Sequence, residues 1–488
     1  MNTKKRHSDN DLSDDVEILH IKKQKNGNSE NFNNIDAGMN LTRVENLQNC
    51  YNKNTVTLSS LLSKKKSTNI IQFNFLLDLD WFMTQVPLHS RNTAKILFIH
   101  GIRDIPESSQ LYPNTRFLAP HIPLPYGSHH TKAMLLFYDD DTMQVVIHTA
   151  NLVPGDWYFK TQAVWTSPFL SKKTDEYIKS GRECEFEKEL CKYIRYYNIP
   201  VLNRLAERVS LYNFEECKAI LISSVPGIHR GKELNNWGHL QLRNILNTKY
   251  QMKFNTSEIK KESYIIAQMS SIGALGKDDR WLNKEFGQSL RNSISGIDSK
   301  VNIKLIYPTV DNVRNSLEGW NGGNCLPFSN SNWQKQSNYM GKILNIWKAD
   351  NSGRTKAMPH IKTYTRIDND EISWFLLTSA NLSKAAWGTL QKQGNQLMIR
   401  NYELGVLILP ELFDDKKKNN VKITNYYDNT NKIKYSSNIK TVAVPIPFDL
   451  PLTPYPPKSV NSDPNTTSPW TWDVQRNDLD LFGRKYCP

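Results

Sequence analysis

The stretch GSHHTKAMLLFYDDDTMQVVIHTANL, residues 127–152, decides the fold because the chain repeats its plan once more. A His-x-Lys motif leads into an apolar strand, a polar turn, a second apolar strand and an asparagine. Residues 360–382, HIKTYTRIDNDEISWFLLTSANL, follow the same order. A constant offset of 230 positions relates the matching residues of the two copies: His130 and His360, Lys132 and Lys362, Asn151 and Asn381, and the later Trp157 and Trp387.

This repeat predicts an α/β protein with a duplicated fold. We expect two similar halves related by a pseudo-twofold axis, with the active site between them. The first domain is expected to cover residues 41–222 and the second to cover residues 223–488. A Lys- and Asn-rich stretch, residues 414–440, is typical of a low-complexity surface insertion in the second domain.

The composition limits the kinds of partner. The chain has 488 residues, 39% of them hydrophobic, so it can bury an extended core. Its 62 Lys and Arg outnumber 48 Asp and Glu, and the net charge of +14 favours nucleic acid or an anionic membrane surface. The longest apolar run, residues 133–138, is far shorter than the ~20 residues of a spanning helix. We expect a soluble protein that is not secreted.

The N-terminal residues 1–40 are rich in Asn, Asp, Ser and Lys and are predicted to be a disordered head. Two basic clusters, Lys4-Lys5-Arg6 and Lys22-Lys23-Gln24-Lys25, flank an acidic spacer. This is the pattern of a bipartite nuclear import signal, and it predicts a nuclear location. A solvated charged tail explains the same clusters equally well.

The repeated residues suit phosphodiester chemistry. Alternate residues of a strand share a face, so the His and Lys of each motif are expected to project together, with each asparagine reaching the same pocket. The transition state gains charge on phosphoryl oxygens and needs positioned cations. One imidazole can act as nucleophile and the other as acid and then base. A single motif is better explained by a structural histidine, whereas the repeated set favours a site.

No carboxylate cluster suited to Mg²⁺ or Zn²⁺ accompanies the motifs, and the six cysteines form no CxxC pair. Neither a metal nor another cofactor is therefore predicted. The symmetry of the repeat leaves open which histidine is the nucleophile.

From about Tyr51 to the C-terminus, the chain resembles the tyrosyl-DNA phosphodiesterases that cleave 3′ adducts, a branch of the phospholipase D superfamily. The superfamily commonly has an Asp five residues after the motif Lys, whereas this chain has Phe137 and Ile367 at these positions. The tyrosyl-DNA phosphodiesterase branch likewise lacks this Asp. The most specific stretches are GSHHTKAMLLFY (127–138), HTANL (148–152), AMPHIKTY (357–364), TSANLSKAAWG (378–388) and YELGVL (402–407).

The resemblance implies a role for each catalytic residue. It implies that His130 is the nucleophile and that His360 is the proton donor and acceptor. The two lysines and two asparagines belong to the same catalytic set, and the lysines also bind substrate. It also implies two imidazole orienters, Glu403 and Gln162, one for each histidine. From the sequence alone, Glu403 is better explained as a surface carboxylate and Gln162 as a polar group at a strand edge.

The resemblance also implies a substrate. It implies hydrolysis of a 3′-phosphodiester between DNA and a tyrosine, such as a topoisomerase I-derived peptide, by a monomer. Two rival functions stay open: a phosphodiesterase of the same fold that acts on phospholipid or bulk nucleic acid, and a DNA-binding scaffold without catalysis. The missing Asp argues against the first rival, and two complete motif sets argue against the second.

Several residues are candidate DNA contacts. A turn of small residues offers hydroxyl and backbone N–H groups to phosphates, although it is also explained as a plain turn. Ser383 is an N-cap, a phosphate contact or both. Tyr126 is either a base-stacking aromatic or a core tyrosine. The residues of the small turn are Ser270, Ser271, Ile272, Gly273 and Ala274, where Ala274 replaces a serine that is commoner in the family.

Overall fold

The computed structural model describes residues 34–102, 104–249, 263–291, 301–414, 420–427, 439–457 and 463–488. Both basic clusters of the predicted import signal lie outside these residues. The predicted disordered head extends too far, because residues 34–40 already contribute two short strands, β1 (Asn34–Asp36) and β2 (Met39–Leu41). Met39 and Leu41 are buried where β2 pairs with β8. A strand of three residues is too short to give a recognisable sequence pattern, so this pairing could not be predicted.

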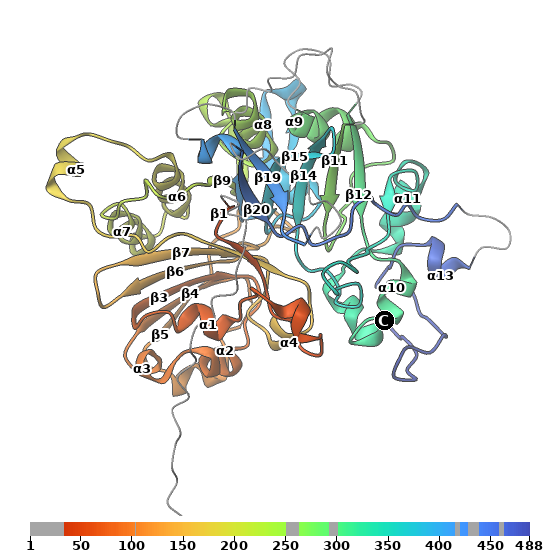
Figure 1. Ribbon diagram of the computed structural model, residues 1–488, viewed down its shortest axis with the longest axis horizontal. Coiled ribbons are helices and arrows are strands. Elements are labelled where there is room, and N and C mark those ends of the chain that lie inside the picture. The colour runs from red at the N-terminus through yellow and green to blue at the C-terminus, as the bar shows by residue number, and fades with distance from the viewer. Residues whose placement is uncertain are drawn as a thin grey trace, which may run out of the picture.

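The described residues of the first half of the chain form a seven-stranded sheet. Its strand order is β2-β8-β7-β6-β3-β4-β5, shown from red to yellow in Figure 1. Most connections follow chain order, and β6 and β7 form the predicted antiparallel hairpin. The remaining bounds are β3 (Ser67–Asn74), β4 (Lys95–His100), β5 (Thr115–Leu118), β6 (Ala133–Tyr138), β7 (Met143–His148) and β8 (Ala163–Thr166).

In the part of the chain that the structure describes, the second sheet has ten strands, and it is coloured mainly green to blue in Figure 1. Its main path is β1-β20-β19-β15-β14-β11-β12-β13, and β18 pairs with both β15 and β9. Its bounds are β9 (Ile220–Ser224), β11 (Tyr264–Gln268), β12 (Asn302–Ile306), β13 (Leu344–Asn345), β14 (Thr363–Asp368), β15 (Glu371–Thr378), β18 (Glu403–Ile408), β19 (Val421–Asn425) and β20 (Lys440–Val444).

The two sheets share one topology. The order β8-β7-β6-β3-β4-β5 in the first matches β18-β15-β14-β11-β12-β13 in the second. The strand directions match as well, since β3 and β4 are parallel, as are β11 and β12, while each hairpin is antiparallel. The sequence repeat therefore corresponds to a structural duplication centred on the hairpins β6–β7 and β14–β15.

Two boundaries of the predicted domains meet regular structure. The expected boundary at residue 222 falls inside β9, which pairs with β18 of the second sheet. The predicted insertion at 414–440 contains β19, whose Val421 and Ile423 are buried against the sheet. This strand is difficult to predict from the sequence, because only alternate residues in it are apolar and the stretch around it is rich in Lys and Asn.

Helices and a small sheet surround the two main sheets. The small sheet consists of β10 (Gly227–Arg230), β17 (Gln396–Ile399) and β16 (Thr389–Gln391). The α-helices are α1 (Leu58–Leu62), α2 (Leu79–Gln85), α3 (Leu88–Arg91), α4 (Pro154–Tyr158), α5 (Asp175–Lys179), α6 (Glu185–Tyr196), α7 (Pro200–Val209), α8 (Gly238–Lys249), α9 (Gly287–Arg291), α10 (Val310–Arg314), α11 (Asn330–Met340), α12 (Lys384–Trp387) and α13 (Pro464–Thr467).

Alternate side chains of strand β6 contribute to two different hydrophobic cores. Leu135 and Phe137 of β6 lie in a large core that extends into the second half of the molecule. Met134 and Leu136 of the same strand lie in a smaller core on the other face of the first sheet. Because successive side chains of a strand point to opposite faces, an uninterrupted apolar run produces a strand buried on both sides. This rigid hairpin carries the first His-x-Lys motif at its start.

Candidate active site

Each His-x-Lys motif lies just before its strand rather than within it. His130 and Lys132 precede β6, and His360 and Lys362 precede β14. The pairing nevertheless continues past the strand ends, because His148 N–H donates to Lys132 O at 3.0 Å. The equivalent bond in the second half runs from Thr378 N–H to Lys362 O at 3.1 Å. The motifs are therefore held in extended geometry by their own hairpins.

The backbone of each histidine is also bonded to the opposite half. His130 N–H donates to Tyr402 O at 3.0 Å, beside β18 of the second sheet. His360 N–H donates to Thr161 O at 3.1 Å, just before β8 of the first sheet. The two motifs are thus brought to one interface. Lys132 lies close enough to lower the pKa of both His360 and Lys362 electrostatically.

His130 is held by a carboxylate from the second half. Its Nδ1 lies 2.9 Å from Glu403 Oε2, and Glu403 also accepts bonds from Ser379 Oγ and Asn401 Nδ2. Burial lowers the pKa of His130, while the charge of Glu403 raises it. Glu403 is buried, so a surface carboxylate is the wrong interpretation of this residue. Its acceptor fixes the proton on Nδ1 and leaves Nε2 of His130 for chemistry.

His360 has two partners from the first half. Its Nδ1 lies 2.9 Å from Gln162 Nε2 and 3.1 Å from Asp156 Oδ2. Burial lowers the pKa of His360 to about 3, against the opposing charge of Asp156. The sequence interpretation missed Asp156, because the repeat places Ala386 at the equivalent position. The one local signal was an acidic residue directly before the buried Trp157.

Both motif lysines are fully buried, and each Nζ donates to the carbonyl oxygen of the histidine two residues earlier. Burial lowers the pKa of Lys132 to about 8, opposed by the charges of Glu403 and Asp156. Burial and the charge of Lys132 lower the pKa of Lys362 further. Two such cations stabilise an anion that enters between them, because the dry surroundings screen their charge poorly.

The two asparagines occupy similar positions but have different partners. Asn381 Oδ1 accepts bonds from Ser270 N–H at 3.1 Å and Ser271 N–H at 3.0 Å. This leaves the Nδ2 donors of Asn381 for a ligand. Asn151 Oδ1 is buried and has no hydrogen-bond partner among the residues that the structure describes. Both asparagines follow their strands by three residues instead of ending them.

The predicted DNA-contact turn packs directly beside Ser383. Gly273 N–H donates to Leu382 O at 2.9 Å, and a Cβ on Gly273 would lie only 2.7 Å from Ser383 Cβ. Ser383 caps α12 by accepting from Ala386 N–H. Ile272 is buried as a whole residue, so it offers no exposed surface to DNA. This apolar residue anchors the turn to the core, while Ser271, Gly273 and Ala274 stay at least partly exposed.

The other predicted DNA contacts are placed as follows. The hydroxyls of the turn already donate within the protein, from Ser270 to Asn381 Oδ1 and from Ser271 to Pro327 O. Ala274 is exposed. Tyr126 is 93% exposed and has a φ of 60°, so the core-tyrosine interpretation is wrong. Its ring stands free for stacking, four residues before His130.

A basic groove continues from this turn. A cavity of about 640 Å³ is lined by Leu275, Gly276 and Lys384, which directly follow the turn and Ser383, and by Trp281 at its base. Basic side chains outnumber acidic ones around it. The charged lining residues are Arg243, Lys277, Arg280, Lys284 and Lys384 against Asp278 and Glu285.

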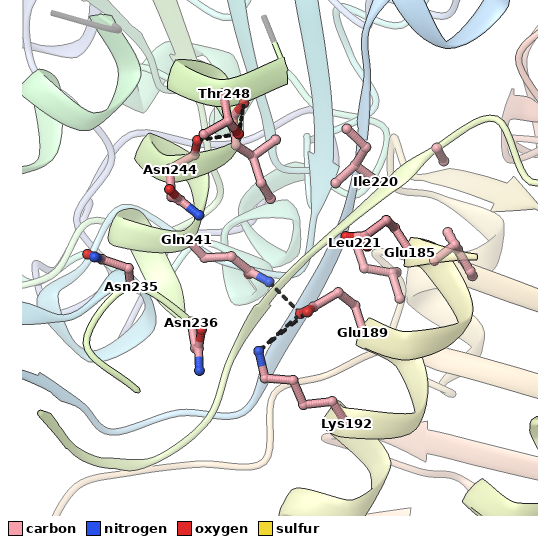
Figure 2. Close-up of a pocket in the computed structure, with 13 residues that line it drawn as sticks. Glu185, Glu189, Lys192, Ile220, Leu221, Asn235, Asn236, Gln241, Asn244 and Thr248 are labelled. Atoms are coloured by element: carbon pink, nitrogen blue, oxygen red, sulfur yellow. Dashed lines mark hydrogen bonds and ion pairs between the residues drawn. The ribbon is translucent and has the colours of Figure 1, made fainter. Parts of the chain in front are cut away.

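A second cavity lies apart from the histidines, between α6, β9 and α8. It has a volume of about 230 Å³ and is lined mainly by amides, carboxylates and a few apolar side chains (Figure 2). Glu189 in its wall is bonded to both Lys192 and Gln241. These polar groups satisfy one another, and none of the motif residues lines this cavity.

Within the described ranges, no group of three or more His, Cys, Asp and Glu side chains is arranged to hold a metal ion. None of the helices in the part of the chain that the structure describes is long and apolar enough to cross a membrane.

Comparisons with known proteins agree with this arrangement. The profile of the tyrosyl-DNA phosphodiesterase family matches residues 38–456. Tyrosyl-DNA phosphodiesterase 1 of Arabidopsis thaliana is 35% identical, covering 91% of this chain and 75% of that protein. The Drosophila melanogaster protein of the same name is 32% identical, covering 83% and 69%.

A solved structure tests the fold. The crystal structure of yeast tyrosyl-DNA phosphodiesterase superposes with a TM-score of 0.64 at 22% sequence identity, covering 86% of this chain and 96% of that one. The expected duplicated α/β fold is thereby confirmed. With the family profile and the relatives that match over most of its length, the chain belongs to the tyrosyl-DNA phosphodiesterase family of phosphodiesterases.

Proposed function

We propose that this enzyme repairs DNA by hydrolysing the 3′-phosphodiester bond between DNA and a tyrosine through a phosphohistidine intermediate. The observation that carries the proposal is the crossed support of the two histidines. Glu403 of the second half holds Nδ1 of His130, and Gln162 and Asp156 of the first half hold Nδ1 of His360. Each imidazole therefore presents Nε2 to the same interface, as a nucleophile and an acid facing one phosphorus require.

In the first step, Nε2 of His130 attacks phosphorus while the bond from phosphorus to the tyrosine oxygen breaks. His360 gives its Nε2 proton to that oxygen, so tyrosine leaves as the neutral phenol. In the second step, water attacks the phosphohistidine and gives a proton to Nε2 of His360. His130 leaves with its electron pair, and the DNA retains a 3′-phosphate.

The lysines and asparagines supply the electrostatic part of this mechanism. Lys132 and Lys362 are buried cations that stabilise the charge gathering on the phosphoryl oxygens. Asn381 keeps its amide donors for the same oxygens because its carbonyl oxygen is bound to the turn at Ser270 and Ser271. This turn and Ser383 then lie beside the phosphate that precedes the scissile one.

We propose a single DNA strand as the substrate form. Tyr126 stacks on a base near the 3′ end. The basic groove beyond Lys384 binds the phosphates that lie further toward the 5′ end of the strand. The proposed catalytic residues act on the phosphorus and its oxygens rather than on the tyrosine ring, so the same chemistry suits other groups that are esterified to the 3′-phosphate. Other 3′ blocking groups are therefore substrates as well, besides peptides derived from topoisomerase I.

The function is tested with a 3′-phosphotyrosyl oligonucleotide in the presence of EDTA. The expected product is an oligonucleotide with a free 3′-phosphate. A parallel reaction with vesicles of phosphatidylcholine tests the phospholipase alternative and should release no headgroup. Failure to cleave the oligonucleotide, or equal cleavage of lipid, would contradict the proposal.

Two further proposals concern the environment of the enzyme. We propose that it acts as a monomer, since both histidines and their partners come from one chain. Sedimentation at micromolar concentration should give a mass near 56.4 kDa. We also propose a nuclear location, based on the two basic clusters. Replacing Lys22, Lys23 and Lys25 with Gln in the full chain should then redistribute it to the cytoplasm.

A further inference from the structure

We propose that Asp156 is the positioning residue of His360, holding the Nδ1 proton and stabilising the imidazolium that protonates the departing tyrosine. This inference rests on the proposed function but adds a residue that neither the repeat nor the resemblance supplies. The offset of 230 that relates the two histidines relates Asp156 to Ala386, whereas Glu403 at the start of β18 and Gln162 directly before β8 occupy matching places in the two halves. The carboxylate of Asp156 therefore breaks the symmetry of the halves.

Asp156 and Gln162 make opposite demands on one nitrogen. An amide N–H of Gln162 needs Nδ1 of His360 to be a free acceptor, whereas the carboxylate of Asp156 needs Nδ1 to carry a proton. The amide can rotate its oxygen toward Nδ1 and keep Thr149 as its other partner, because a hydroxyl both donates and accepts. The ionised carboxylate has no such freedom, so Asp156 decides the tautomer.

Asp156 is fixed in place for this task. It lies in the first turn of α4, behind Pro154, and its side chain is buried. Its Oδ2 accepts the Asn151 N–H at 2.6 Å, and the same oxygen lies 3.1 Å from His360 Nδ1. Bonding the Asn151 N–H alone would need only a neutral acceptor. A buried charge costs free energy unless hydrogen bonds or opposite charges stabilise it. For Asp156 these are the hydrogen bonds from His360 and Asn151 and the nearby charge of Lys362.

The charges around the two histidines support a proton on His360 when substrate is bound. Among the described residues around the two histidines, three lysines face three carboxylates, and in their usual ionisation states these charges cancel while both imidazoles are neutral: Lys132, Lys160 and Lys362 against Asp156, Glu318 and Glu403. A phosphodiester brings one negative charge. The uptake of one proton restores the charge balance. The His360 ring, which contacts Asp156, is the one placed to take up this proton and then to donate it as the acid.

Without substrate, the site disfavours the protonated form of His360. The charge of Asp156 therefore has to stabilise this imidazolium against its surroundings. Burial lowers the pKa of His360, and Lys362 and Lys132 lower it further, while Asp156 is the charged group that raises it. Burial opposes the ionisation of Asp156 itself, yet His360 and Lys362 hold its pKa below the usual value. Asp156 therefore stays ionised throughout the cycle, and only His360 gains and loses the proton.

The test replaces Asp156 with Asn, which keeps an acceptor for the Asn151 N–H but removes the charge. We expect turnover of a 3′-phosphotyrosyl oligonucleotide to fall ~10²-fold or more, with a small change in KM. The covalent enzyme–DNA species should accumulate, because activating water depends on His360 more than releasing a phenol does. Asp141→Asn removes a surface carboxylate that is 78% exposed, and it should behave as wild type.

A substrate with a better leaving group separates positioning from general damage. With a 3′-(4-nitrophenyl phosphate) oligonucleotide, the first step needs little acid, so Asp156→Asn should form the covalent species at nearly the wild-type rate and then stall. A variant with a distorted site would lose both steps together. That result, or a smaller loss in Asp156→Asn than in Gln162→Ala, would overturn the proposal.

A spectroscopic measurement keeps the inference separate from the proposed function. In wild type, a downfield proton resonance on Nδ1 of His360 should be present and should disappear in Asp156→Asn and in His360→Gln. An unchanged resonance in Asp156→Asn would contradict the contact itself. If wild type keeps the resonance but fails to cleave phosphotyrosyl DNA, the proposed function is wrong while the positioning contact stands.

Discussion

Glu403 and His130 lie 273 residues apart in the chain, and their side chains meet at 2.9 Å across the interface of the two halves. The opposite crossing joins Gln162 to His360, 198 residues later. Each histidine is therefore oriented by the half that it does not belong to. The site forms only when the halves dock, which makes its geometry a property of the interface.

Glu403→Gln should slow the first step. The amide oxygen can still accept from Nδ1, but the charge that supports the attacking imidazole is lost. We expect formation of the covalent species to slow ~10²-fold or more in single-turnover experiments, without accumulation of that species. Glu371→Gln, on an exposed carboxylate of β15, is the matched control. Accumulation of the covalent species in Glu403→Gln would place its role in the second step.

The two histidines should give unequal variants. A phenol with a pKa near ~10 leaves with modest help, whereas water with a pKa of ~15.7 must be activated to attack the phosphohistidine. His360→Ala should therefore trap a covalent enzyme–DNA species, seen as a shifted band after denaturation, and His130→Ala should not. A band in His130→Ala alone would invert the two roles. A band in neither would remove the covalent intermediate from the mechanism.

Lys132→Ala and Lys362→Ala should each lower single-turnover rates by ~10²-fold or more, because each lysine is a buried, preorganised donor to the phosphoryl oxygens. Affinity for a 3′-phosphotyrosyl strand should change less than the rate. Lys95→Ala on the exposed end of β4 is the control. Rates near wild type together with weaker binding would reduce both lysines to phosphate anchors.

The basic groove should contribute to the salt dependence of DNA binding. Lys277 and Lys284 are exposed in its lining. Neutralising both with Gln should lower the slope of log K against log salt by about 0.7 for each lost phosphate contact. The matched control is Lys66→Gln with Lys95→Gln on the first sheet. Equal slopes in the groove and control variants would remove the groove from the DNA path.

Stability should fall between pH 7 and pH 5. Burial lowers the pKa of His129, His148 and His360 to about 3, from 6.5 in the unfolded chain. Between these values the unfolded state binds more protons, so the stabilisation is complete above pH 6.5 and declines as the pH falls, by up to ~1.4 kcal/mol per pH unit for each histidine. Urea unfolding at several pH values measures this slope. A flat response would show that these rings protonate in the native state.

The sequence by itself determined the two hairpins and their polar residues. Strands buried on both faces appear as continuous apolar runs, and a constant offset between polar motifs survives because both copies need the same geometry. The two His-x-Lys motifs, at His130 and His360, could therefore be predicted from the sequence alone. These features depend on contacts close in sequence, where the spacing of residues fixes which side chains share a face.

Only the tertiary structure decided which groups support the histidines. Asp156 carries no repeat signal, and its role depends on the approach of His360 from the other half. The burial of Ile272, the exposure of Tyr126 and the strand β19 likewise depend on packing partners that are distant in the chain. A carboxylate looks the same in sequence whether it faces solvent or an imidazole. The docking of the two halves, which buries apolar surface over many residues, is what makes the difference.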